Sequence, residues 1–132
     1  MRILFLTNSV TDFGAAFLYN GLLQTFGPET VYDYPIKNTY HGGVGVGMWG
    51  AQQYKYGPLP WMPAYPMPYP AGISSREDCL AEVLRMLQAG EFDLCILESL
   101  RIGVREALAE LGSALLKSDI PVILHDGEDN LG

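Results

Sequence analysis

The feature that most restricts the fold of this chain is the alternation of short apolar runs with segments of helical periodicity. The four runs expected to form strands are residues 2–7, 30–36, 93–98 and 120–124. Strands that are separated by helices predict a parallel sheet with right-handed crossovers. We therefore expect an α/β fold, a Rossmann-like or flavodoxin-like three-layer structure with a parallel sheet of about four strands.

One helix is expected in each connection between these strands. Asp12 can cap a helix at residues 13–26. A capping box at Ser74–Glu77 predicts the start of a second helix, which Ala89-Gly90 ends. Apolar residues at helical spacing over 104–115 predict the third helix.

The predicted sheet order is 2-1-3-4, and the order 3-2-1-4 is the alternative. In the preferred order the first helix alone covers one face, although parallel sheets are normally covered on both sides. We therefore expect apolar sheet surface that further sequence or another chain covers. The 132 residues are interpreted as one domain, the N-terminal half of a larger two-domain protein, or as a subunit of a homo-oligomer joined through the uncovered sheet face.

The charge balance argues against several classes of partner. The chain carries 15 acidic and 8 basic residues, and this net charge of −7 disfavours nucleic acid and anionic membranes. No apolar run reaches the roughly 18 residues of a membrane span, and residues 1–6 are not a signal peptide. Cys79 and Cys95 are too few for a zinc site or a disulfide framework, so we expect buried thiols and a cytoplasmic protein.

The connection at residues 37–73 is far longer than the roughly two to six residues usual between a strand and a helix. It is rich in glycine at 42–50 and in proline at 58–70, with aromatic residues that include Trp49 and Trp61. Three interpretations remain open: a lid whose rings stack on a ligand such as a sugar, a cover for the domain's own core, and a proline-rich partner site. Its glycines match neither a P-loop nor a dinucleotide-binding fingerprint.

Polar residues follow the predicted strands at the edge where parallel α/β folds bind ligands. The predicted substrate-binding residues, in the insert and at this edge, are Asn8, Ser9, Asp12, Trp49, Trp61, Glu98, His125, Glu128 and Asp129. Asn8 and Ser9 precede a helix N-terminus, which suits an anion, although Ser9 and Asp12 can equally cap that helix. The acidic residues around Asp126 offer ligands for a hard cation or a base beside His125, but no metal site is predicted.

Segments spread over nearly the whole chain carry a family resemblance. Residues 2–6, 33–42, 56–60, 92–94 and 120–129 together resemble the N-terminal domain of bacterial GT-B glycosyltransferase-like proteins of the spore-maturation type. The Asp-Gly-Glu-Asp sequence near the end is the most specific of these segments.

The resemblance implies a two-domain enzyme that needs no metal or other cofactor. Its N-terminal half would hold the acceptor, and a C-terminal half absent from this sequence would bind the nucleotide-sugar donor. The catalytic base would be His41 or Asp126, and His41 is preferred because the aromatic insert would place it beside a bound sugar. The isolated chain is then expected to be inactive.

Two other functions remain as alternatives. A non-enzymatic interaction or assembly domain would use the insert and the uncovered sheet face to contact a partner. A flavodoxin-like domain would bind flavin mononucleotide, because Thr7, Ser9 and Thr11 resemble in part the hydroxyl-rich phosphate loop of flavodoxins.

Overall fold

The computed structural model describes residues 1–8, 13–37, 40–41, 65–73 and 75–125. In chain order the elements are β1 (Ile3–Leu6), α1 (Phe13–Phe26), β2 (Val31–Tyr34), α2 (Arg76–Gln88), β3 (Leu94–Leu97), α3 (Ile102–Ser118) and β4 (Val122–Leu124). Every predicted strand and helix is therefore present, with ends that differ from the prediction by a few residues.

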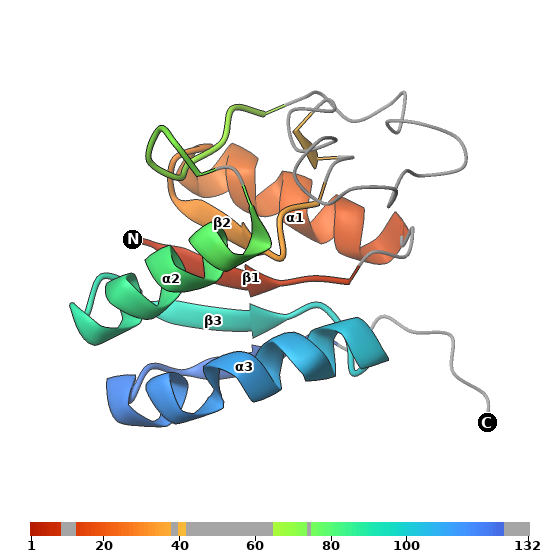
Figure 1. The fold of residues 1–132 in the computed structure, drawn as a ribbon. Coiled ribbons are helices and arrows are strands. Elements are labelled where there is room, and N and C mark those ends of the chain that lie inside the picture. The colour runs from red at the N-terminus through yellow and green to blue at the C-terminus, as the bar shows by residue number, and fades with distance from the viewer. Residues whose placement is uncertain (9–12, 38–39, 42–64, 74, 126–132) are drawn as a thin grey trace.

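All four strands are parallel and form one sheet in the order β2-β1-β3-β4 (Figure 1). The predicted order 2-1-3-4 is confirmed, and the alternative order 3-2-1-4 is wrong. Leu6 of β1 lies level with Tyr34 of β2 and Leu97 of β3, so these three strands end together. The chain thus has the α/β architecture of Rossmann-like and flavodoxin-like folds.

Local backbone chemistry sets the ends of the helices. Gly27 after α1 and Gly90 after α2 have φ angles of 95° and 70°, a region that glycine enters without a steric penalty. At the start of α2, Ser75 is the N-cap, and its hydroxyl oxygen accepts a hydrogen bond from the amide of Asp78 at 3.0 Å. The predicted capping box at residues 74–77 is therefore one residue too early, because two adjacent serines offer the same capping chemistry.

Two apolar clusters fill the two faces of the sheet. The buried residues on the α1 face are Ile3, Phe5, Ala16, Tyr19, Leu23, Val31, Tyr40 and Ile96. On the opposite face, side chains of β1, β2 and β3 pack against α2 and α3. Figure 1 shows both helices on this face of the sheet. Cys79 and Cys95 are buried in this second cluster, as predicted. The expected distribution of one helix on one face and two on the other is confirmed.

Within the described sheet, the apolar side chains that remain uncovered belong to the edge strand β4 rather than to one whole face. Val122, Ile123 and Leu124 are 44–50% exposed, whereas Ile96 of the neighbouring β3 is only 6% exposed. The pairing of Ile123 with Ile96 places it on the α1 face, and its two neighbours lie on the opposite face. The prediction of a largely uncovered sheet face was too broad, because Phe5, Val31 and Ile96 on the α1 face are all buried.

The described end of the long connection packs against β2. The rings of Tyr69 and Tyr32 meet edge to face with centroids 5.1 Å apart, and the Tyr69 hydroxyl donates to the carbonyl of Asp33 at 2.9 Å. Residues 65–73 therefore cover the core, in agreement with one of the three interpretations of the insert. Residues 42–64, which contain Trp49 and Trp61, lie outside the described residues.

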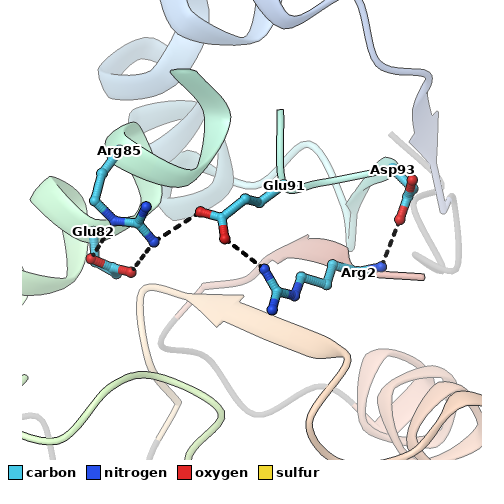
Figure 2. Close-up of polar contacts among 5 residues, drawn as sticks. All are labelled: Arg2, Glu82, Arg85, Glu91 and Asp93. Atoms are coloured by element: carbon cyan, nitrogen blue, oxygen red, sulfur yellow. Dashed lines mark hydrogen bonds and ion pairs between the residues drawn. The ribbon is translucent and has the colours of Figure 1, made fainter. Parts of the chain in front are cut away.

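A chain of exposed ion pairs ties α2 to the amino end of the sheet, as Figure 2 shows. Arg85 contacts Glu82 at 2.7 Å and Glu91 at 2.8 Å, and Glu91 in turn contacts Arg2 at 2.8 Å. The backbone amide of Arg2 also donates to Asp93 at 2.8 Å. These contacts lie at the amino end of β1 and β3, so they leave the carboxyl edge of the sheet to other residues.

Candidate functional site

A group of buried polar side chains lies at or near the carboxyl ends of β1, β2 and β3. Within the described residues these side chains are Thr7, Asn8, Asp33, Lys37, His41, Glu98 and Ser99, and none is more than 5% exposed. Buried charges are costly unless they are paired. The contacts that pair them therefore define what this edge of the sheet can do.

Glu98 is the acidic centre at the end of β3. Asn8, which follows β1, donates a hydrogen bond from Nδ2 to Glu98 Oε1. The ammonium of Lys37 lies 3.8 Å from Glu98 Oε2 and 5.1 Å from the centre of the Tyr40 ring. The Lys37 and Glu98 side chains are 2% and 0% exposed, so this ion pair is removed from water. An ion pair in such a place attracts strongly, but it also loses much hydration energy.

Gly103 allows α3 to begin directly above Asn8. A Cβ atom at position 103 would lie 2.9 Å from Asn8 Cβ and 3.3 Å from Asn8 Cα. Contacts shorter than about 3.0 Å do not occur between such atoms without movement. The glycine thus lets the first turn of α3 pack directly on Asn8, whose side chain donates to Glu98.

Asp33 of β2 is the second acidic centre and accepts several hydrogen bonds. Its Oδ2 accepts from the backbone amide of Lys37 at 2.8 Å, and its Oδ1 lies 2.8 Å from His41 Nε2. The hydroxyl of Tyr19 on α1 donates to Oδ1 at 3.4 Å. Burial first, and then the Asp33 carboxylate, raise the pKa of Tyr19 well above its ordinary value, so this hydroxyl keeps its proton.

Both nitrogens of the His41 ring face hydrogen-bond acceptors. Nε2 faces the Asp33 carboxylate, and Nδ1 lies 3.1 Å from the backbone carbonyl oxygen of Tyr65, which can only accept. Burial lowers the pKa of His41, but Asp33 and the Tyr65 carbonyl raise it by more than burial lowers it. The pKa of His41 therefore lies above 6.5. A general base needs a free lone pair. In this arrangement the ring is held as a donor.

The two acidic centres belong to one polar chain that crosses the edge of the sheet. Lys37 links them, because its amide donates to Asp33 and its ammonium lies beside Glu98. At the far side, Nδ1 of the half-buried His125 lies 3.3 Å from the Glu98 carbonyl oxygen. We call the series His41–Asp33–Lys37–Glu98–Asn8, with His125 at its end, the polar chain. It connects the ends of all four strands.

The structure brings some of the predicted site residues together. Asn8, Glu98 and His125 meet at the ends of β1, β3 and β4, and His41 joins them through Asp33 and Lys37. The predicted residues Ser9, Asp12, Trp49, Trp61, Asp126, Glu128 and Asp129 lie outside the described residues. The flavin alternative depends on Ser9 and Thr11, which lie there too.

Three residues of this site were missed in the sequence. Asp33 and Lys37 are charged residues in or beside a strand that was expected near the sheet edge, where charge normally faces water. No sequence pattern marks Gly103 as part of the site, because its role depends on the approach of Asn8 from the end of β1. A charged residue inside a short strand of otherwise aromatic and aliphatic residues was the one available signal for Asp33.

Other features of the described residues lie apart from the polar chain. A groove of about 560 Å³ lies between α2 and α3 and is lined by different residues, among them Leu84, Gln88, Ser113 and Lys117. No three of the described His, Cys, Asp or Glu side chains are grouped so that they could hold a metal ion. Within the same part of the chain, none of the helices has the length and apolar character needed to span a membrane.

Compared with models of protein families, with curated proteins and with solved structures, the chain matches none of them. Its function must therefore be argued from the geometry of the polar chain and from the sequence.

Proposed function

We propose that this chain is the acceptor-binding domain of a glycosyltransferase that transfers a sugar from a nucleotide-sugar donor. The observation that carries the proposal is the polar chain, which crosses the carboxyl edge of a parallel α/β sheet. Ligands of such folds bind outside the carboxyl ends of the strands. The aromatic residues of the insert after β2 add rings of the kind on which sugars stack.

In this proposal the residues of the polar chain have different roles. Asn8, Glu98 and His125 form the floor and rim on which the acceptor sits. Asp126, directly after His125 in sequence, is the proposed base that takes the proton of the acceptor hydroxyl. The acceptor oxygen then bonds to the anomeric carbon of the donor as the bond to the diphosphate breaks. His41 positions the connection at the edge, because both of its nitrogens are engaged. The donor binds to a second domain.

A titration of the isotopically labelled chain with simple sugars tests acceptor binding. We expect glucose, N-acetylglucosamine, maltose or cellobiose at millimolar concentration to shift the amide resonances of Asn8, Glu98, Ser99 and His125. His125→Ala should weaken this binding, whereas the control Lys117→Ala in the groove between α2 and α3 should not. The proposal would be contradicted if resonances shifted only around that groove, or if none of these sugars shifted any amide resonance.

The exposed edge strand favours assembly as a second candidate function. β4 pairs with β3 on one side, and no other described strand pairs with it. Its three apolar side chains are 44–50% exposed, and natural proteins normally protect such edges. A second copy could extend the sheet by pairing its own β4 in the antiparallel direction.

Sedimentation measurements test this assembly. We expect a dimer that Ile123→Lys dissociates, because a charge on the paired edge opposes its burial. Phe17→Lys is the matched control, since Phe17 is 63% exposed on α1, away from the edge. A wild-type chain that stays monomeric at high micromolar concentration, or a dimer that only the control dissociates, would refute pairing through β4.

A further inference from the structure

We propose that the contact among Asp33, His41 and Tyr65 is a pH-sensitive link, which holds Tyr65 against β2 while its proton is bound and releases it when that proton is lost. Tyr65 and His41 stand on either side of residues 42–64 in the sequence, and Asp33 belongs to the sheet. The proposal concerns conformational control and does not depend on the proposed transferase function.

The geometry of the link requires one shared proton. The Asp33 carboxylate and the Tyr65 carbonyl lie on opposite sides of the imidazole ring, at 2.8 Å and 3.1 Å. A neutral imidazole has one N–H group and one lone pair. Satisfying both contacts therefore needs either an imidazolium beside a carboxylate or a neutral ring beside a protonated carboxyl. The two forms carry the same number of protons.

Loss of that proton leaves one contact unsatisfied in either tautomer. If the ring keeps its proton on Nε2, the lone pair of Nδ1 faces the Tyr65 carbonyl oxygen. If it keeps the proton on Nδ1, the lone pair of Nε2 faces the Asp33 carboxylate. The His41 and Asp33 side chains are 0% exposed, so solvent does not relieve either contact. A buried polar contact without its hydrogen bond destabilises the arrangement that contains it.

The groups around the link do not supply a substitute proton. From α1, the hydroxyl of Tyr19 already donates to Asp33. From the segment after β2, the amide of Lys37 donates to the other carboxylate oxygen, while its ammonium lies beside Glu98 and over the Tyr40 ring. Tyr40 stacks on Tyr19 with ring centres 4.0 Å apart. These contacts leave the His41 ring as the group of the link whose protonation changes with pH.

The part of the chain that the link holds is small and well defined. The amide of Tyr65 donates to the carbonyl of Tyr40 at 3.0 Å, and its hydroxyl donates to Asn20 on α1. Both contacts sit beside the His41–Tyr65 bond. When that bond is lost, we expect Tyr65 and residues next to it to open more often while the sheet stays folded.

The direction of the pH effect follows from the environment of His41. Burial lowers its pKa, but the Asp33 carboxylate and the Tyr65 carbonyl raise it more, so the folded-state pKa lies above the ordinary 6.5. A raised pKa gives stability that is complete below pH 6.5 and is lost as the pH rises through the folded-state value. Within that window the equilibrium constant between the closed and the open link falls up to tenfold for each pH unit.

The first test uses the fact that the chain contains only two histidines. His125→Gln leaves His41 as the only imidazole, and its ring resonances can then be followed by NMR between pH 5.5 and 9. We expect a midpoint above 6.5 that Asp33→Asn lowers. A midpoint at or below 6.5 in a protein that is still folded would overturn the proposal. The wild-type chain gives the same measurement with two signals if a variant does not fold.

The second test measures whether Tyr65 is released. Amide hydrogen exchange, corrected for its intrinsic pH dependence, should show a protection factor at Tyr65 that falls across the titration of His41. The control is the amide of Cys95, which donates to the Pro121 carbonyl at 2.9 Å on the other side of the sheet and should keep its protection. Equal changes at Tyr65 and Cys95, or no change at Tyr65, would refute the link. Sugar binding plays no part in either readout.

Discussion

Replacing Gly103 by alanine tests whether the first turn of α3 packs directly on Asn8 of the polar chain. Glycine inside a helix normally destabilises a protein by about 0.5–1 kcal/mol relative to alanine. At position 103, however, the added Cβ would meet Asn8 Cβ at 2.9 Å and Asn8 Cα at 3.3 Å. Neither atom is the tip of a flexible side chain. Relief therefore requires α3 or the end of β1 to move.

The expected magnitude combines these two effects. Overpacking a close contact costs about 1–3 kcal/mol, and the gain in helix propensity offsets less than 1 kcal/mol of it. We therefore expect Gly103→Ala to lower the free energy of unfolding by about 1–2 kcal/mol. The displaced Asn8 should also weaken its hydrogen bond to Glu98, which a change in the Asn8 side-chain amide resonance would report.

A matched control lies in the same helix. Gly112 has no atom within 4 Å of a Cβ placed there, so Gly112→Ala should raise the free energy of unfolding by about 0.5–1 kcal/mol. Urea unfolding followed by circular dichroism gives both values under the same conditions. If both variants are stabilised by similar amounts, α3 does not press on Asn8, and the close packing at position 103 is refuted.

Three further predictions concern the buried ion pair, the surface ion pairs and the thiols. Lys37→Met should lower the free energy of unfolding by about 3 kcal/mol, because it leaves the Glu98 carboxylate buried without its cation. Adding Glu98→Gln should restore much of that loss in urea unfolding. If the losses of the two single variants simply add in the double variant, the two groups do not interact. Glu91→Gln should cause a small loss of stability that disappears in 1 M salt, and a loss that persists there would show that its contacts are not electrostatic. Burial raises the pKa of Cys79 and of Cys95 to about 12, so a thiol reagent at pH 8 should modify them only after denaturation, and rapid modification of the folded chain would contradict their burial.

The fold was predictable because its signals are local. Apolar runs of strand length alternate with helical spacing, and glycine and serine mark the ends of the helices, so all seven elements and the sheet order followed from the sequence. The sequence did not predict which segments cover the edge strands of the sheet. Among the described strands β2 pairs only with β1, yet all four of its residues are buried. Tyr69 and its neighbours return to it from more than 30 positions away.

The candidate site was only partly predictable, because its residues act through distant partners. Asn8 and Glu98 were found from their positions at strand ends, but their contact joins residues that are 90 positions apart. Lys37 had no recognisable pattern, and the only signal for Asp33 was its charge within an apolar strand, since nothing local shows that a charged side chain will point into the core. His41 was found, but its expected role as a base came from the family resemblance and from the aromatic insert beside it. Neither could reveal the two acceptors that flank its ring.

The burial of the polar chain determines how its function can be studied. Its charged side chains already bind one another: Glu98 holds Asn8 and Lys37, and Asp33 holds His41. A ligand at this edge would therefore contact the half-buried His125 before it reached any buried charge. Variants of the buried charges will change the stability of the fold together with any binding, so their effects on activity cannot separate the two. Changes at the rim, read residue by residue through amide resonances, report on the ligand without disturbing the pairs beneath it.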